Sequence, residues 1–364
     1  MMKFSDIFEF QSKSGIKAGD GLEAGKYFFY TSSNEQSKFF NEYLFDGDAL
    51  VFGTGGNPSV HFNDSKFAVS TDCLVAQPKD KRKVYAKFYY YFLRGNMRIL
   101  EKGFKGAGLK HISKGYISAI ELPKVDFDQQ KKIVEILDHA DVLRQRRKQS
   151  LQLLDDFLRA TFLDMFGDLE NRKKWKIVRL NEFIRHLTSG GRGWSKYYAE
   201  VGARFIRSFD VQMNSISNDE KMYIKPPKNQ EADRTRIEPL DILLTITGSK
   251  IGRVATIPEG FEEAYVSQHV AIIRVDKINR LYLSYYLSML ECGQRIIQRQ
   301  QYGQTKPGLS LDQIKKFPIP NPPIKLQNKF AQIVGHLEQT KQKMQTSLAE
   351  MDNQFNALTQ RYFG

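Results

Sequence analysis

The sequence repeats itself at a constant offset of 197 residues, and this repeat limits the folds that the chain can adopt. The match starts where Val69-Ser70 pairs with Val266-Ser267, and it runs without a gap to Phe166-Gly167, which pairs with Phe363-Gly364. Chance does not produce so many ungapped matches. The period far exceeds the roughly 20 to 50 residues of a solenoid repeat, so the chain contains a duplicated domain together with its connector.

The two halves diverge upstream of this repeat and can be aligned there only with gaps. Residues 46–50 still resemble residues 239–243. Each half therefore has a variable front and a shared back, and two similar domains imply a pseudo-twofold arrangement. A length of 364 residues is also sufficient for two or three domains, each with a core of its own.

Each half ends in a segment whose seam positions alternate in steps of four and three, which predicts a long helix with a heptad seam. Helices of roughly 38 residues would be about 57 Å long. We expect them to pair as a rigid antiparallel coiled coil with one globular domain at each end. Arg144 and Lys341 occupy equivalent seam positions, which we interpret as places where the seam opens to solvent or to another subunit. The predicted seam residues are Ile133, Leu137, Leu151, Leu154 and Leu158, with Phe330, Val334, Leu337, Leu348, Met351 and Phe355.

The variable fronts alternate short β-like runs with loops rich in Gly, Ser, Thr and Asn, and each front is followed by an aromatic helix. These helices are predicted at residues 84–100 and 281–297. Their aromatic residues recur at helical spacing, so core packing explains them better than base stacking does.

The charge of the chain indicates an anionic partner, most commonly nucleic acid, because its formal net charge is +14. Residues 81–114 contain ten Lys or Arg against the single acid Glu101, and residues 171–207 contain ten against Glu182 and Glu200. Two such basic islands beside glycine-rich loops favour contact with phosphates.

Candidate DNA-binding side chains lie in these islands and loops, where their donors and acceptors suit base edges or phosphates. In the first half they are Thr54, Asn57, His61, Lys105 and Lys110. In the second half they are Arg192, Lys196, Arg207, Thr247, Ser249, Lys250, Gln268, Gln304 and Lys306.

Motifs for catalysis are missing from the sequence. It has no phosphate-binding P-loop, no His-Glu-x-x-His and no dinucleotide-binding glycine pattern. Residues 321–324 resemble the Asn-Pro-Pro-aromatic motif of amino-methyltransferases, but Ile324 lacks the ring that would stack on a flipped base, so we interpret them as a helix entry. Cys73 and Cys292 stand far apart, which predicts neither a metal site nor a disulfide. With no apolar span and no signal peptide, we expect a cytoplasmic protein.

A repeated block connects each globular domain to its helix. The first copy, Ile112 to Val134, reads Ile-Ser, Ile, Leu-Pro and Gln-Gln-x-x-Ile-Val with spacers between, and Leu309 to Val334 is similar. Two variable units, each followed by this block and a long helix, resemble the specificity (S, or HsdS) subunits of Type I restriction-modification systems. The resemblance covers nearly the whole chain.

The resemblance implies the fold and the domain limits. The fold is two α/β (α+β) target recognition domains joined by two long helices that form an antiparallel coiled coil. We expect the first recognition domain at residues 1–122, the first helical region at 123–167, the second recognition domain at 168–319 and the second helical region at 320–364.

The resemblance also implies a non-catalytic subunit that recognises a bipartite double-stranded DNA target and scaffolds two methylation and two restriction or motor subunits. S-adenosylmethionine, ATP and Mg would be bound by those partners, and this chain would hold no cofactor. Two other functions stay open from the residues alone. They are an autonomous DNA adenine methyltransferase and a coiled-coil DNA-binding scaffold without sequence specificity.

Overall fold

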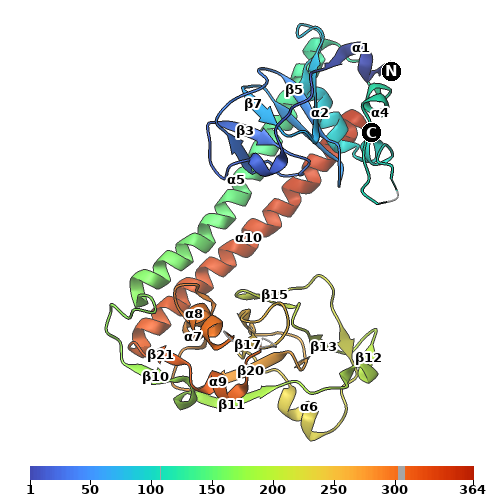
Figure 1. Ribbon diagram of the computed structural model, residues 1–364. Helices are drawn as coiled ribbons and strands as arrows, with labels where there is room; N and C mark the ends of the chain where they lie inside the picture. The colour runs from blue at the N-terminus through green and yellow to red at the C-terminus, as the bar shows by residue number, and fades with distance from the viewer. Residues whose placement is uncertain (107, 302–307) are drawn as a thin grey trace. The chain divides into compact units, whose positions relative to one another are not determined.

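The computed structural model describes residues 1–106, 108–301 and 308–364, and it divides into two compact units (Figure 1). Unit 1 comprises residues 1–149 and 344–364, and unit 2 comprises residues 150–343. Helices α5 (Phe127–Phe166) and α10 (Ile324–Phe363) each contribute to both units. Each unit therefore consists of a globular part and segments of the two long helices.

Each globular part contains an antiparallel four-stranded sheet with the same strand topology. The sheet of unit 1 has the order β2 (Phe8–Phe10), β8 (Cys73–Pro78), β5 (Ala49–Gly53), β6 (Ser59–Asn63). The sheet of unit 2 has the order β11 (Ile184–Ser189), β20 (Val270–Val275), β17 (Ile242–Thr245), β18 (Val254–Thr256). The duplication seen in the sequence is thus a duplication of fold.

A second sheet in each unit includes one parallel strand pair. In unit 1 its order is β4 (Lys38–Phe40), β3 (Tyr27–Tyr30), β7 (Phe67–Val69), and β3 runs parallel to β7. In unit 2 its order is β12 (Tyr198–Ala199), β16 (Tyr223–Ile224), β13 (Ala203–Ile206), β19 (Ala264–Val266), and β13 runs parallel to β19. Unit 2 also carries the small hairpin of β14 (Val211–Gln212) and β15 (Ser215–Ile216) and the helix α6 (Gln230–Thr235).

Strand pairing corrects the sequence alignment of the two fronts by one residue. Leu50 pairs with Ala76, and the residue that lies 197 positions after Ala76 is Ile273, which pairs with Ile242. Leu50 therefore corresponds to Ile242, whereas the sequence comparison matched it with Leu243. A shift of one residue in the alignment would match side chains that lie on opposite faces of the strand. Leu50 and Ile242 each lie in the main core of their unit, so the packing supports matching these two residues.

Each predicted aromatic helix is two shorter helices in the structure. Residues 84–100 form α2 (Ala86–Gly95) and α3 (Arg98–Glu101), and α7 (Arg280–Ser288) and α8 (Gly293–Gln301) stand in place of one helix at 281–297. The aromatic residues of α2 and α7 pack into the cores as predicted. Tyr89 and Tyr282, which the repeat does not place at equivalent positions, are both fully buried. In unit 2 the Tyr282 ring packs on Phe166 with 4.7 Å between ring centroids. The Tyr282 ring thus joins the globular part to α5, and because both rings are buried neither is available for base stacking.

The long helices pack together within each unit along the predicted seam. Ile133, Leu137 and Phe355 are buried in unit 1, and Leu158, Phe330 and Val334 are buried in unit 2. The other predicted seam residues are half-buried: Leu151, Leu154, Leu337, Leu348 and Met351.

The interpretation of Arg144 and Lys341 as openings of the seam is wrong. Arg144 donates to Asp352 of α10 at 2.6 Å and lies over the Phe355 ring. Lys341 lies 2.6 Å from Asp155 of α5. The offset of 197 residues relates both cations and both acids, so the two ion pairs are copies of one cross-helix contact. They hold the helices in one antiparallel register.

Candidate nucleic-acid interface

The loops that follow the parallel strands meet at one edge of the globular part in unit 2. Because β13 and β19 are parallel, the chain leaves both strands at the same end. The Ser267 amide donates to the Ile206 carbonyl at 2.9 Å, and the Ile246 amide, just after β17, donates to the His269 carbonyl at 2.9 Å. We call residues 207–209, 246–250 and 267–269 the unit 2 edge.

Unit 1 has the same edge, made by equivalent backbone bonds. The Ser70 amide donates to the Tyr30 carbonyl at 2.8 Å, and the Thr54 amide donates to the Asp72 carbonyl at 2.8 Å. We call residues 31–33, 54–58 and 70–72 the unit 1 edge. The backbone framework is thus shared, while the side chains that it displays differ.

A hollow of about 320 Å³ lies at the unit 2 edge. Its wall includes Trp194, which is 4% exposed and stacks on Phe205 with 5.5 Å between ring centroids. Three predicted DNA-binding residues line this hollow, namely Arg192, Arg207 and Gln268. The structure therefore brings together cations and an amide from three separate loops.

Arg207 is part of the framework of this edge. Its Nε and one terminal nitrogen each donate to Asp210 at 3.1 Å, and the same terminal nitrogen donates to the Glu220 carbonyl at 2.6 Å. The bonds to Asp210 raise the pKa of the Arg207 guanidinium. Arg192, in contrast, is an exposed residue and is the better placed of the two for DNA.

The remaining predicted residues of unit 2 lie near the same edge or outside the described residues. Lys196 is exposed in the short turn beside the hollow, Ser249 is exposed, and Thr247 and Lys250 are half-exposed. Gln304 and Lys306 lie outside the described residues.

Two predicted residues of unit 1 have structural contacts. Thr54 donates through its hydroxyl to the Asp72 carbonyl at 2.9 Å. His61 packs on the Tyr30 ring, and its Nε2 lies 2.8 Å from the Ser33 carbonyl oxygen. Burial lowers the pKa of the His61 imidazole, so this side chain is neutral near pH 7. Both side chains therefore contact backbone carbonyls of the unit 1 edge and stabilise it.

The other three predicted residues of unit 1 are exposed. Asn57 lies in the loop between β5 and β6, and Lys105 and Lys110 flank a loop closed by a bridge between Lys105 and His111. His111 Nδ1 lies 3.2 Å from the Thr54 carbonyl oxygen, which ties this loop to the unit 1 edge. Asn57, Lys105 and Lys110 are the candidates for DNA contact in unit 1.

Several cations of the basic islands have acidic partners. Arg204 is 1% exposed, donates to Asn218 at 2.6 Å and lies 3.3 Å from Glu262. Lys87 donates to Asp138 at 2.7 Å. The count of basic residues in a sequence segment therefore overstates the charge available for phosphates.

Sequence reasoning missed His269, Ser267 and Phe209, which line the hollow. Phe209 is 63% exposed. Ser267 lies where the ungapped repeat begins, next to the part of the sequence in which the two halves diverge. This position was the one sequence signal that could have indicated Ser267 as a site residue.

No group of three or more His, Cys, Asp or Glu side chains that could hold a metal ion gathers in the described part of the chain. Burial raises the pKa of the Cys73 thiol to about 11 and that of Cys292 to about 12, so both are unreactive near pH 7. Among the described helices, none has the length and hydrophobicity to cross a membrane.

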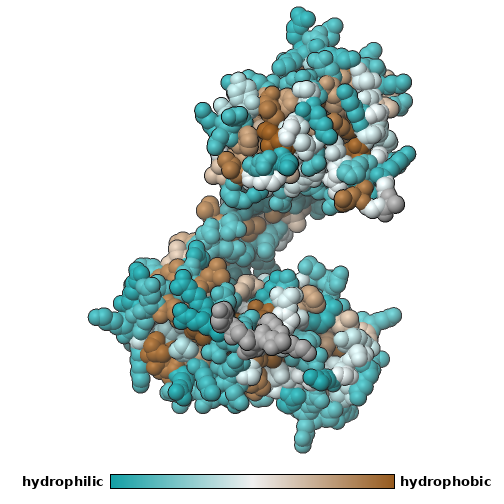
Figure 2. Space-filling view, in the orientation of Figure 1, coloured by the Kyte–Doolittle hydropathy of each residue, from teal (hydrophilic) through white to brown (hydrophobic). Residues whose placement is uncertain are grey.

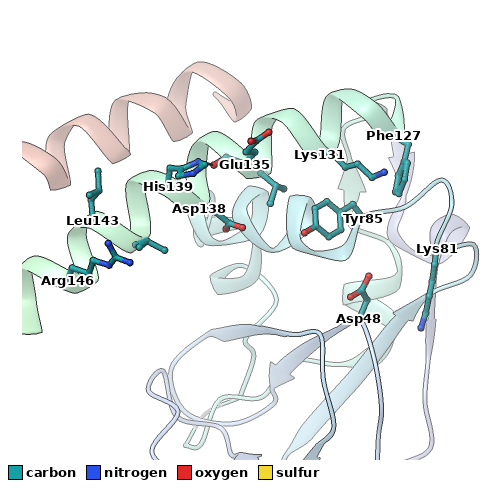
Figure 3. Close-up of a pocket in the computed structure, with 12 residues that line it drawn as sticks. Asp48, Lys81, Tyr85, Phe127, Lys131, Glu135, Asp138, His139, Leu143 and Arg146 are labelled. Carbon is teal, nitrogen blue, oxygen red and sulfur yellow. Dashed lines mark hydrogen bonds between the residues drawn. The ribbon is translucent and has the colours of Figure 1, made fainter.

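A groove of about 940 Å³ lies in unit 1 between the start of α5 and the globular part (Figure 3). Burial raises the pKa of the Asp48 carboxyl in this groove, and Lys81 partly offsets the effect. The labelled lining residues from α5 are Phe127, Lys131, Glu135, Asp138, His139, Leu143 and Arg146, and those from the globular part are Asp48, Lys81 and Tyr85.

Unit 2 has a smaller groove, of about 310 Å³, at the equivalent place. Ile324 and Asn328 line it at the positions that Phe127 and Lys131 occupy in unit 1. The same concave feature is therefore present once in each unit.

The faces of the two long helices differ in polarity. Val142 and Leu143 of α5 are 47% and 54% exposed, whereas the equivalent residues of α10 are the polar Gln339 and Thr340. In Figure 2 apolar side chains are visible along the long helices and also in patches on the globular parts, among a larger hydrophilic surface. Exposed apolar residues beside a groove are typical of a protein-binding surface.

Comparison with known proteins identifies one family over most of the chain. The family described as Type I restriction modification DNA specificity domain matches residues 1–153 and again residues 172–351. The Type I restriction enzyme MjaVIII specificity subunit of Methanocaldococcus jannaschii is 21% identical over 306 residues, which cover 79% of this chain and 71% of that protein. The Type I restriction enzyme EcoDI specificity subunit of Escherichia coli is 27% identical over 157 residues, which cover 42% of this chain and 34% of that protein.

Solved structures share the fold. The S subunit of a Type I restriction-modification system from M. genitalium superposes with a TM-score of 0.67 at 16% identity, over 100% of this chain and 95% of that chain. A chain from a structure concerned with complex assembly and conformational transition of the type I R-M system gives a TM-score of 0.53 at 16% identity, over 100% of this chain and 96% of that chain.

Proposed function

Because the chain belongs to the family of Type I restriction-modification DNA specificity subunits, we propose that it reads a bipartite DNA target, with one half-site for each unit. The observation that supports this proposal is the edge that is built twice. Equivalent backbone bonds hold three loops together in each unit, and the loops display different side chains. Two edges with the same backbone bonds but different side chains are suited to recognising two different DNA sequences.

The long helices have a mechanical role in this proposal. Each runs for 40 residues, and paired cross-helix contacts fix their register. A stiff pair of helices would set the number of unspecified base pairs between the half-sites. Two methylation subunits would bind the chain and use S-adenosylmethionine, and two restriction subunits would use ATP and Mg. This chain would contribute recognition and assembly without catalysis.

Removing a cation that binds a phosphate is expected to weaken binding to all DNA sequences alike. We expect alanine at Arg192, Lys196 or Lys250 to lower the slope of the logarithm of affinity against the logarithm of salt concentration by about one for each phosphate that is no longer neutralised. Titration of duplex DNA at several salt concentrations measures this slope. Lys343→Ala, at an exposed position of α10, serves as the control and should leave the slope unchanged.

Unchanged affinity and slope in all three variants would show that these loops do not bind DNA. Wild-type protein without any sequence preference would support the non-specific scaffold. Methyl transfer by the purified chain alone would support the autonomous methyltransferase.

We further propose that the groove of unit 1 docks a methylation subunit. The groove combines apolar and charged side chains, and Val142 and Leu143 extend its apolar surface. The equivalent groove of unit 2 would take a second copy of the same partner, because the two units are duplicates. Its smaller size and the polar face of α10 make this second contact weaker.

A charge in the apolar part of the groove is expected to disrupt the assembly. We expect Leu143→Glu to weaken binding of the methylation subunit about fivefold or more, since loss of an interface anchor costs more than about 1 kcal/mol. The exposed position makes a loss of fold stability beyond about 0.5 kcal/mol unexpected. Thr340→Glu, at the equivalent position of α10, is the matched control with a smaller expected effect. Titration followed by sedimentation gives the affinity of each variant for the methylation subunit. Equal weakening by the two variants would contradict the proposal that the groove of unit 1 binds this subunit more strongly than the groove of unit 2.

A further inference from the structure

The side-chain amide of Gln268 is exposed at the unit 2 edge and contacts His269, which in turn contacts Thr247. Gln268 Nε2 lies 3.2 Å from His269 Nε2. His269 Nδ1 in turn lies 2.5 Å from the Thr247 hydroxyl oxygen. Thr247 is itself fixed by a backbone bridge to Gly308. These contacts connect the exposed amide of Gln268 to the backbone of the unit 2 edge.

The chemistry of these groups decides the direction of each bond. An amide nitrogen can only donate, so His269 Nε2 accepts the bond from Gln268. A neutral imidazole then carries its proton on Nδ1, where it donates to the Thr247 hydroxyl. Within residues 1–106, 108–301 and 308–364, no contact uses the other N–H or the carbonyl oxygen of the Gln268 amide, so both can bind a ligand. The amide thus presents one donor and one acceptor side by side.

We propose that Gln268 reads an adenine in the DNA half-site of unit 2. In the major groove adenine offers the N7 acceptor and the N6 amino donor, which match the free N–H and the carbonyl oxygen of a glutamine amide. Guanine offers two acceptors and would leave the carbonyl oxygen unpaired. His269 and Thr247 act as positioning residues in this arrangement. The inference rests on the proposed function and adds a base to it.

The hollow beside Gln268 supports a ligand at this position. Ser267 is 7% exposed and lines the hollow, and its hydroxyl oxygen has no hydrogen-bond partner within residues 1–106, 108–301 and 308–364. Buried polar groups are rarely left without a partner, so this hydroxyl is suited to a bound base or water. Phe209, 63% exposed in the same hollow, offers an apolar surface for the thymine methyl group of an A·T pair.

Unit 1 has no equivalent of the pair formed by Gln268 and His269. The offset of 197 residues places Thr71 and Asp72 where unit 2 has Gln268 and His269. Asp72 is exposed, and its carboxylate only accepts hydrogen bonds. We therefore expect the adenine contact in one half-site alone.

The test uses the full chain assembled with its methylation subunits. The target of the wild-type assembly is first selected from random duplexes, and each base pair of it is then changed singly. Gln268→Ala should reduce discrimination by roughly 5- to 150-fold at one A·T pair of one half-site and leave the other positions unchanged. Gln268→Glu, of nearly the same shape, should lose the preference for adenine at that pair. His269→Ala should affect the same pair by a smaller factor.

A single-atom probe separates reading from general binding. Replacing that adenine by 7-deazaadenine, which lacks the N7 acceptor, should weaken the wild-type assembly and leave Gln268→Ala unaffected. Gln345→Ala, at an exposed position of α10 away from the grooves, is the control. Retained discrimination at every pair, or a loss at a G·C pair or uniformly at all pairs, would overturn the proposal. A wild-type assembly without sequence preference would instead overturn the proposed function.

Discussion

Replacement of Gln327 by leucine is expected to lower the free energy of unfolding of unit 2 by about 2–6 kcal/mol. Gln327 is fully buried at the start of α10. Its side-chain oxygen accepts from the Asn279 amide at 2.8 Å, and its nitrogen donates to the Pro322 carbonyl at 2.8 Å. Leucine has a similar size but leaves the part-buried Asn279 amide and the buried Pro322 carbonyl without this partner, at about 1–3 kcal/mol each.

Gln130 makes the equivalent contacts in unit 1. It is 1% exposed, accepts from the Tyr85 amide at 2.8 Å and donates to the Val125 carbonyl at 2.8 Å and the Lys83 carbonyl at 3.2 Å. Gln130→Leu should therefore destabilise unit 1 in the same way. These two glutamines attach each globular part to the long helix that follows it.

The two tryptophans of the chain, Trp175 and Trp194, both belong to unit 2 and allow the units to be followed separately. Gln327→Leu should shift the urea transition seen by tryptophan fluorescence to lower urea, whereas Gln130→Leu should shift only the transition seen by far-ultraviolet circular dichroism. Gln332→Leu, at an exposed position of α10, should move neither by more than about 0.5 kcal/mol. An equal shift of the fluorescence transition by Gln130→Leu and Gln327→Leu would contradict the claim that each glutamine stabilises its own unit.

The architecture was predictable from the sequence because it rests on periodicity. The offset of 197 residues and the heptad spacing are properties of the chain itself, and they predicted the duplication and the long paired helices. The repeat even matches Gln130 with Gln327. Their role was not predictable, because their partners Tyr85 and Asn279 lie 45 and 48 residues away in the chain.

The candidate site was predictable only in part, because side-chain partners across loops leave no local pattern. Arg207 and His61 have the residue types of DNA-reading side chains, yet Asp210 and the Ser33 carbonyl hold them in the framework. Conversely, His269 has no motif around it, and its contact with Thr247, 22 residues away, is seen only in the structure. Ion pairs such as that of Arg204 likewise reduce the charge that a count of residues suggests.

Exchange of one recognition domain should change one half of the DNA target. Replacing residues 168–319 by those of a relative removes the whole unit 2 edge and leaves unit 1 and both long helices intact. The incoming domain has to keep an aromatic residue at position 282, because the Tyr282 ring packs on Phe162 and Phe166. The preference for the original second half-site should fall by roughly 10³-fold or more, the usual margin of specific over non-specific DNA binding.

Adenine methylation mapped across the genome of a host that carries the complete system measures this outcome directly. The wild-type chain should produce one two-part motif with an unspecified spacer. The exchanged chain should produce a motif with the same first part, the same spacer length and a new second part. A continuous motif, a change in both parts, or an unchanged motif would contradict the account in which each unit reads its own half-site.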